Sequence, residues 1–568
     1  MVTTRCHEGT ELERRVLIAL FLSFLVLFAY QTFFPSAPTT PRTVTSGTPL
    51  AGASDAVSAV NQSDATPPPT AVVGGEAETD VKVETPHVVA TFTNRGARLK
   101  SWRLKEYRDP SGNPLELIDA TLSGQPLPFS LTLADATTTS LLNSVLYAVK
   151  QSGEQVEFEY RNESGLNVTK VFTLNPASYT VDVQVRVLQN GGPVIPTIQW
   201  GPGLGDRDSQ TGRYAVKPEV LFSSEGSISR VTSGDISESP NYNQNFDYVG
   251  IDDHYFAVFA VKPGTVKVNY QAVQVAPPAG SEEAARELVA FSLTPAAADQ
   301  KLTFFAGPKE FDTLASIDRN ITKAINFGMF SVIVVPLLRS LNWIHGYVGN
   351  YGWAILVLTL LINLVLFPLN HKSVVSMRKM QEIQPEAKAI QERYSKLKST
   401  DPAKQKMNSE LMTLYRENGV NPASGCIPIL LTLPVFLAFY ALLTTAIELR
   451  GAPFVGWIHD LSLPDPFYVM PVLVGASQIL TQWMTPQAGM DPMQQKMMMI
   501  MPVALIFVFV STPSGALIYW LVGNVWRLGQ MQLTNYIHPP KVHVIRPAAE
   551  RRVKRVGGGK TDTATREN

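Results

Sequence analysis

LTLLINLVLFPL, residues 358–369, is an almost unbroken apolar run with a single amide, Asn363, near its middle. It belongs to a longer apolar segment, 351–369, which as a helix rising about 1.5 Å per residue is about 28 Å long. That length matches the hydrocarbon core of a bilayer, so the segment is predicted to span a membrane. The amide needs an explanation, because a hydrogen-bonding group without a partner costs free energy in hydrocarbon.

Other parts of the chain share this apolar character. Residues 16–34 form a run of spanning length that ends in the bulky sequence QTFFPS, which favours an uncleaved anchor over a cleaved signal peptide. Residues 427–530 are predicted to contain four more spans, the last two separated by the helix-breaking sequence STPSG at 511–515. The chain is therefore predicted to be a polytopic α-helical membrane protein with six transmembrane helices.

The basic residues of the loops predict the orientation of these spans. Ten Lys or Arg residues lie in 370–426 and eight lie after Gln530, whereas the loop 448–466 has only Arg450. By the positive-inside rule, both termini and the 370–426 loop face the cytoplasm. In a bacterium, the spans then lie in the inner membrane and the long segment after the first span is periplasmic.

The segments outside the spans differ in composition. Residues 35–84 are rich in Ala, Thr, Ser, Pro and Gly, which is typical of a flexible linker. Residues 85–310 alternate apolar and polar side chains in short runs broken by turn residues, which predicts a large periplasmic all-β sandwich domain. The apolar core of 311–345 has only about 12 residues and contains Pro336, too short to cross a bilayer. That segment is predicted to be an amphipathic helix in the membrane interface, with packing on the sandwich as the alternative. The other segments are a cytoplasmic N-terminus at 1–15, a cytoplasmic helical hairpin at 370–426 with a kink or restart at Pro385, and a basic cytoplasmic tail at 531–568.

The sequence contains none of the common catalytic or cofactor motifs. It lacks GxxxxGK[ST], HExxH and GxSxG, and its eight His residues are scattered without the spacing of metal ligands. Asp252, Asp253 and His254 form the densest polar group of the sandwich domain, but neighbouring residues of a strand point to opposite faces. We therefore expect no catalytic site, no metal and no cofactor.

Polar residues inside the spans are the candidate functional residues. They are Thr359, Asn363, Thr432, Thr444, Thr445, Ser477, Gln478, Thr481, Gln482, Tyr519, Asn524 and Arg527. Thr359 and Asn363 are four residues apart and share a helix face. If these side chains face inward, they line a wet cavity; the alternative is that each bonds a neighbouring helix and stabilises the bundle.

Several long motifs, in one order and spacing, resemble the YidC family of membrane insertases. They are GCIPILLTLPVFLAFYALL (425–443), APFVGWIHDLSLPDPFYVMPVL (452–473), DPMQQKMMMIMP (491–502) and PSGALIYWLVGN (513–524). The resemblance covers residues 311–535 strongly, and the first span and the sandwich domain fit the Gram-negative form of the family more loosely.

This resemblance implies an insertase and chaperone of the inner membrane, not an enzyme. It implies that nascent membrane proteins are the substrates, brought by ribosomes and the signal recognition particle pathway. It also implies that the insertase acts alone or with the SecYEG translocon and its accessory Sec proteins. Membrane lipids are a further implied partner. The implied core has five spans around a hydrophilic groove that is open to the cytoplasm and to lipid, with Thr359 and Trp520 at groove positions.

The chain departs from the family pattern in this groove. Asn363 stands where many members carry an arginine, Thr432 where many carry a glutamine, and Trp520 where a tyrosine is common. Trp520, Asn524 and Arg527 follow i, i+4, i+7 spacing and share one helix face. Arg527 and Asn363 are predicted to differ in depth by about 5 Å. We expect Arg527 to supply the positive field of the groove, with a simple interfacial anchor as the alternative.

The tail adds a second basic feature. Arg551, Arg552, Lys554 and Arg555 precede GGGK, a pattern that suits contact with ribosomal RNA or anionic lipid, or simply fixes the topology. Two other function classes stay open. One is a transporter or channel, for which repeat symmetry would be expected. The other is an anchored periplasmic carbohydrate-binding protein.

Overall fold

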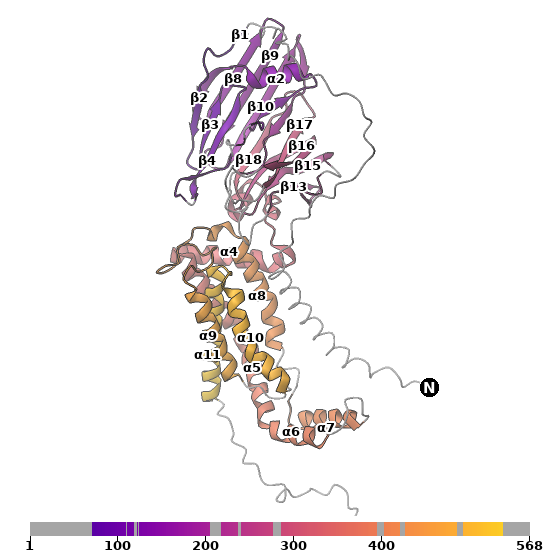
Figure 1. The fold of residues 1–568 in the computed structure, drawn as a ribbon, viewed down its shortest axis with the longest axis vertical. Helices are drawn as coiled ribbons and strands as arrows, with labels where there is room; N and C mark the ends of the chain where they lie inside the picture. Colours follow the sequence, from indigo (N-terminus) through magenta and orange to yellow (C-terminus); the bar gives the residue numbers. More distant parts are fainter. Residues whose placement is uncertain are drawn as a thin grey trace, which may run out of the picture. The chain divides into compact units, whose positions relative to one another are not determined.

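The structure is a computed structural model that describes residues 71–109, 111–118, 122, 124–204, 217–236, 240–275, 286–394, 403–420, 427–485 and 492–537. The predicted anchor at 16–34, most of the predicted linker and the basic residues 551–555 lie outside the described residues. All the described residues belong to one compact unit. Within it, a β-domain (residues 71–308) is followed by a helical region (Figure 1).

The β-domain consists of two antiparallel sheets. The path through the larger sheet runs β1-β8-β9-β10-β18-β16-β15-β13-β14, and the smaller sheet is β2-β3-β4-β5. The strands of the smaller sheet are β2 (Asp80–Glu84), β3 (Val88–Thr93), β4 (Arg98–Arg108) and β5 (Pro114–Glu116). The larger sheet contains β1 (Ala71–Val73), β6 (Ser130–Thr132), β7 (Ala148–Ser152), β8 (Gln155–Asn162), β9 (Leu166–Leu174), β10 (Thr180–Gln189), β11 (Gly192–Val194), β12 (Thr197–Trp200), β13 (Glu219–Ser224), β14 (Ser227–Thr232), β15 (Asn241–Asp252), β16 (Phe256–Val275), β17 (Arg286–Thr294) and β18 (Leu302–Pro308). Among the described residues of this domain, one α-helix, α2 (Ala136–Ser144), interrupts the strands.

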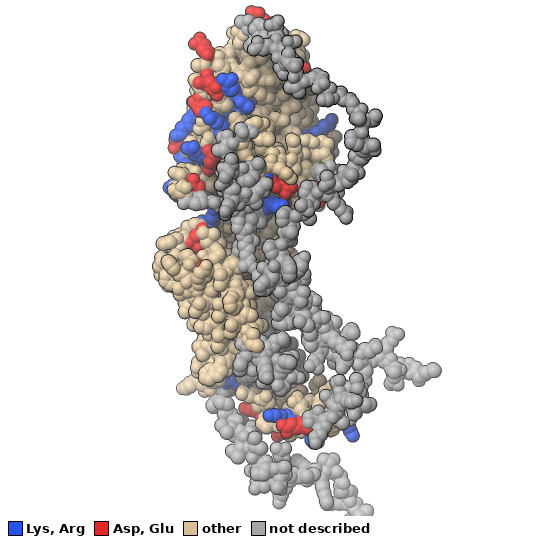
Figure 2. Space-filling model, viewed as in Figure 1, with Lys and Arg blue, Asp and Glu red and all other residues tan. Residues whose placement is uncertain are grey.

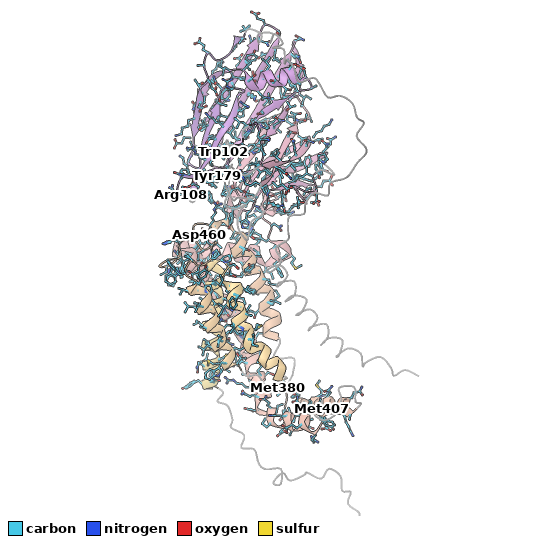
Figure 3. All side chains as sticks on the ribbon, in the orientation of Figure 1. Trp102, Arg108, Tyr179, Met380, Met407 and Asp460 are labelled. Carbon is cyan, nitrogen blue, oxygen red and sulfur yellow. The ribbon has the colours of Figure 1, made fainter. Side chains whose placement is uncertain are left out.

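Alternation along the strands builds the sandwich core. Every second residue of β9 is buried, because successive side chains of a strand point to opposite faces. Phe92 of the small sheet packs on Phe158 and Phe172 of the large one, with ring centroids 6.3 and 4.7 Å apart. Trp102, labelled in Figure 3, donates its indole N–H to the carbonyl of Ala306 at 2.9 Å. These contacts confirm the predicted β-sandwich.

The helical region begins directly after β18. Its longer helices are α4 (Ser331–Val348), α5 (Tyr351–Glu382), α6 (Gln384–Arg393), α7 (Ala403–Glu417), α8 (Ile427–Thr445), α9 (Val469–Met484), α10 (Pro492–Phe509) and α11 (Ser514–Ile537). Shorter elements are α3 (Phe311–Ile317), η2 (Ile321–Ala324), η3 (Gly328–Phe330) and η5 (Ile447–Leu449). Helix α11 packs against both α5 and α9, α4 packs against α5 and α8, and α10 packs against α9.

Two helices are longer than predicted. Helix α4 continues through Pro336, and Gly328–Val348 meets the length and hydropathy requirement for a span, so length does not exclude a crossing; the interfacial placement of this segment stays a prediction. Pro336 lies early in the helix, where its missing N–H removes one bond only. Helix α5 continues 13 residues beyond the predicted end at 369, through Pro368. Among the described residues, Gly328–Val348 and Tyr351–Glu382 meet the length and hydropathy requirement for a span, and Thr432–Thr445 and Ile500–Phe509 are shorter apolar helices.

The outer surface of α5, α9, α10 and α11 is apolar. Its most exposed large side chains are Val365, Trp483, Phe507 and Tyr536, which are 76% exposed or more. On the face drawn in Figure 2, charged side chains lie on the β-domain and on α6 and α7, whereas the part of the helix bundle that is not grey is almost uniformly tan. An apolar surface this extensive requires lipid or protein around it.

Helices α6 and α7 pair as a hairpin beyond the end of α5. The Tyr394 hydroxyl donates to Glu410 at 2.8 Å, and Arg393 lies 3.4 Å from the same carboxylate. Met380 of α5 and Met407 of α7 are labelled on this part of the chain in Figure 3. Arg378 donates to the carbonyls of Met531 and Thr534, which fixes the extension of α5 to the last turn of α11.

Candidate functional site

The inward face of α11 has an exposed residue between buried ones. Asn524, Gln530 and Met531 are 1, 6 and 7% exposed. Arg527 lies three or four residues from each of them, so it projects from the same face of the helix. Its side chain is nevertheless exposed. Arg527 is therefore accessible, although the turns before and after it are packed.

Two of the candidate residues on α11 bond the neighbouring helix α9. The Asn524 amide donates to the hydroxyl of Ser477 at 2.9 Å. The Trp520 indole donates to Oε1 of Gln478 at 3.2 Å. These bonds stabilise the α9–α11 contact, which agrees with the packing alternative for these four side chains.

Thr359 and Asn363 instead bond their own helix. The Thr359 hydroxyl donates to the carbonyl of Ile355 at 2.6 Å, and the Asn363 amide donates to the carbonyl of Thr359 at 2.8 Å. Thr359 is fully buried, whereas Asn363, one turn later on the same face, is partly exposed. The bond of Asn363 uses its NH₂ group, so its carbonyl oxygen is left to accept from water or a substrate.

The bundle is closed at the end where α10 and α11 join. All residues from Ser514 to Tyr519 are buried. Tyr519 stacks on Phe439 with 4.3 Å between ring centroids, and Trp520 meets Phe436 at 4.6 Å and Phe509 at 4.9 Å. We call this group, from α8, α10 and α11, the aromatic layer. The structure thus places Tyr519 in packed aromatic contacts. Thr432, partly exposed, lies one turn before Phe436 on α8.

Packing loosens toward the opposite end of the bundle. On α5, five of the eight residues from Gly352 to Thr359 are buried, whereas between Thr359 and Ser373 the helix has no fully buried residue. On α8, the buried side chains Ala438, Phe439, Leu442 and Leu443 lie in the half nearer the closed end. Asn363 and Arg527 are accessible inward positions beyond the closed end, although Gln530, Met531 and Thr534, farther along α11, are buried again.

Four buried polar atoms at this looser end have no hydrogen-bond partner among the described residues. They are Asn370 Oδ1, Gln482 Nε2, Trp526 Nε1 and Gln530 Nε2, from α5, α9 and α11. Buried polar groups without protein partners are normally satisfied by water. Sequence reasoning singled out Gln482 but missed the other three. For Gln530, the sequence did hold a signal: it lies three residues after Arg527, so it shares the helix face of that candidate residue.

Relatives with known names match the chain almost from end to end. Residues 80–340 match the YidC periplasmic domain family, and residues 343–541 match the 60 kDa inner membrane protein family. A protein of Campylobacter jejuni named membrane protein insertase YidC is 32% identical, over 94% of this chain and 97% of its own length. A protein of the same name from Pelobacter propionicus is 33% identical, over 92% of this chain and 99% of its own length. The chain belongs to the YidC family of membrane protein insertases.

Solved structures of the family were also found. An active YidC insertase is 20% identical, with a TM-score of 0.34 over 83% of this chain and 94% of its own. YidC from Thermotoga maritima is 16% identical, with a TM-score of 0.28 over 80% of this chain and 98% of its own. The names of the sequence relatives describe insertion into a membrane, which agrees with the prediction of a protein that is not an enzyme.

The polar group at residues 252–254 has a structural role in this YidC-family chain. Asp252 pairs with Lys309 at 2.8 Å and with Arg230 at 3.1 Å, and both Asp252 and Lys309 are almost fully buried. Asp253 accepts the backbone N–H groups of Tyr255 and Phe256, which closes the turn between β15 and β16. Among the described residues, no group of three His, Cys, Asp or Glu side chains could hold a metal ion.

Proposed function

We propose that this chain inserts nascent membrane proteins into the bacterial inner membrane through a hydrated groove between α5, α8, α9 and α11. The proposal rests on Arg527, an exposed arginine that lies between the buried residues Asn524 and Gln530 on one helix face. The partnerless polar atoms of Asn370, Trp526 and Gln530 support it, because such atoms need water close to the same opening.

The orientation follows from the loop charges. With ten basic residues in 370–426 and eight after Gln530, the open end of the bundle faces the cytoplasm and the aromatic layer faces the periplasm. Counting the predicted anchor at 16–34, six helices cross the membrane, and the β-domain is periplasmic. The outer apolar surfaces of α5, α9, α10 and α11 contact lipid.

The groove lowers the barrier for the polar part of a substrate. Each polar group moved into hydrocarbon costs several kcal/mol, and a charged one costs more. A wet cavity that reaches part of the way through the bilayer shortens the dehydrated distance. Asn363 offers an uncharged acceptor there and Arg527 a positive charge, so acidic substrate segments are favoured near the cytoplasmic mouth.

The remaining partners belong to the same proposal. Ribosomes and the signal recognition particle pathway deliver substrates, and the SecYEG translocon with its accessory proteins shares some of them. Arg551, Arg552, Lys554 and Arg555 contact ribosomal RNA or anionic lipid, since either surface releases counterions on binding basic side chains.

The Arg527 assignment predicts a substrate-dependent loss of insertion. In cells depleted of the native insertase, Arg527→Ala is expected to reduce insertion of a single-span protein with an acidic N-terminal tail by about tenfold, equivalent to about 1.4 kcal/mol. The double variant Arg527→Ala, Asn363→Ala is expected to insert it less well still. Protease protection of the tail measures insertion.

Two controls separate groove chemistry from folding. A substrate with a neutral tail is expected to insert normally in the Arg527→Ala variant. Arg416→Ala, which removes an exposed arginine of α7, is expected to leave both substrates unaffected. Wild-type insertion of the acidic-tailed substrate by Arg527→Ala, by Asn363→Ala and by the double variant would overturn the groove assignment.

A further inference from the structure

The β-domain holds the end of helix α8 and the segment that follows it. Nε2 of His254, in the turn between β15 and β16, donates to the carbonyl of Thr444 at 2.9 Å. The guanidinium of Arg450 lies over the rings of Tyr255 and Phe256, 5.1 and 5.3 Å from their centroids. One turn of the β-domain therefore contacts both the last carbonyls of α8 and the residues just beyond η5.

An acidic side chain lies between the two contacted residues, Thr444 and Arg450, in the sequence. Glu448 belongs to η5, between the buried side chains of Ile447 and Leu449, so its backbone is held in place. Its Oε1 accepts the backbone N–H of Phe311, the first residue of α3, at 3.4 Å. Burial raises the pKa of Glu448 to about 7; the backbone N–H groups that its carboxyl accepts act in the opposite direction, and the charge of Glu310 adds a smaller upward contribution.

Charged and titratable groups lie on several elements near Glu448 and its contacts. They are Glu310 and Asp312 at the start of α3, Arg339 of α4, Tyr351 of α5, Tyr107 of β4, His254 of the β15–β16 turn, and Arg450. The two arginines are engaged with rings: Arg339 lies 5.1 Å from the Phe311 centroid, and Arg450 covers Tyr255 and Phe256. Among the described residues, no basic side chain is within ion-pair distance of Glu448, and its charged neighbours Glu310 and Asp312 are acidic.

We propose that these contacts form a proton-dependent clamp, in which protonated Glu448 holds the β-domain, α3 and the end of α8 together. Loss of the proton places a third carboxylate beside Glu310 and Asp312 in a poorly solvated position. The clamp then loosens. The chemical signal is the pH of the compartment that contains the β-domain.

The direction of the pH effect follows from the two states of Glu448. In the open clamp its pKa is the ordinary 4.5, and in the closed clamp it is about 7. Between these values the closed clamp binds more protons, so it weakens as pH rises from 4.5 to about 7 and is constant outside this window. At tenfold per pKa unit, the closed-to-open ratio falls by at most about 300-fold.

Loosening of the clamp reaches the helix bundle through α8. The same helix supplies Phe436 and Phe439 to the aromatic layer that closes the bundle. Release of its end therefore loosens the closed end of the groove. This consequence rests on the function proposed above, whereas the clamp itself does not.

Hydrogen exchange of the full chain in lipid nanodiscs tests the clamp without any substrate. Peptides covering 252–257, 310–314 and 444–450 are followed from pH 5 to pH 8, with correction for the intrinsic exchange rate. In the wild type, protection of all three is expected to fall by about tenfold or more. In Glu448→Gln, which keeps an acceptor but cannot ionise, protection is expected to stay high and independent of pH.

Three further variants fix the interpretation. Asp312→Asn removes a repelling charge and is expected to move the midpoint to lower pH. Glu448→Leu, a second non-ionisable variant, is also expected to be pH-independent, and Glu417→Gln, on the exposed part of α7, is expected to retain the wild-type profile. A pH-independent wild type, or a pH dependence that persists in both Glu448 variants, would overturn the clamp. Loss of insertion in the Arg527 variants has no bearing on this readout.

Discussion

Asp252→Ala is expected to lower the free energy of unfolding of the β-domain by about 3–5 kcal/mol, because it leaves a buried cation unpaired. Lys309 is 6% exposed, and its ammonium lies 2.8 Å from Asp252. Without that carboxylate, only the backbone carbonyl of Asp253 remains within its reach. Arg230 also loses its closest acid, at 3.1 Å, and keeps Glu219 at 3.6 Å. Native-state exchange of the β15 and β16 amides, in the full chain, measures the loss.

The double variant Asp252→Ala, Lys309→Met is the matched control. It removes the stranded ammonium and fills its place with an apolar side chain of similar length, so most of the lost stability is expected to return. An Asp252→Ala variant as stable as the wild type would show that the pair contributes little. A double variant less stable than Asp252→Ala would show that the buried charge is not the cause.

Gly250→Ala is expected to destabilise the β-domain by about 3 kcal/mol or more, because the added methyl group has no space. A Cβ on Gly250 would lie 1.9 Å from the carbonyl oxygen of Val258 and 2.9 Å from the Cα of Phe259. Both atoms belong to the backbone of β16, which pairs with β15 directly at this residue. No side-chain rotation can relieve the contact, so the two strands must separate.

Gly234→Ala provides the control for this prediction. A Cβ there would meet nothing closer than Thr232 Oγ1 at 4.0 Å, and its effect is expected to lie within about 0.5 kcal/mol of zero. Denaturation midpoints of the two variants, compared with the wild type, decide the matter. Equal stability of Gly250→Ala and Gly234→Ala would contradict the strand geometry.

Local sequence patterns predicted which helices and strands form more accurately than they predicted the length of each one. Alternation of apolar and polar side chains in residues 85–310 predicted the strands, because one face of each strand is buried, as the burial pattern of β9 shows. Pro513 and Gly515 predicted the break between α10 and α11. The end of α5 could not be predicted, because hydropathy marks where lipid contact ends, not where the helix ends. Pro336 suggested a short segment, yet a proline early in a helix removes only one bond.

The sequence predicted which candidate residues share a helix face, but not which neighbouring residues they contact. The spacing of Trp520, Asn524 and Arg527 placed them on one face of a helix. It could not show that Asn524 bonds Ser477 while Arg527 stays accessible, since that depends on where α9 lies. Likewise, the sequence could not show that Asp252 pairs with Lys309, because the two residues are 57 positions apart. Without a visible partner, Asp252 looked like a possible site residue.

The central claim is that water reaches the inward face of α5 and α11 from the cytoplasm but not their outer face. In a background with Cys6 and Cys426 replaced by serine, single cysteines are introduced at Asn363, Arg527, Leu517 and Val365. A membrane-impermeant maleimide is then applied from the cytoplasmic side. Only a thiol in contact with water ionises and reacts readily.

Strong labelling is expected at positions 363 and 527, and little at 517, which lies in the closed end at 1% exposure. Position 365 decides between a groove and general exposure, because Val365 is 78% exposed on the outer surface of α5 and is expected to lie in lipid. Labelling of 363 and 527 with protection of 365 is the predicted result. Equal labelling of 363 and 365, or protection of both 363 and 527, would contradict a hydrated groove.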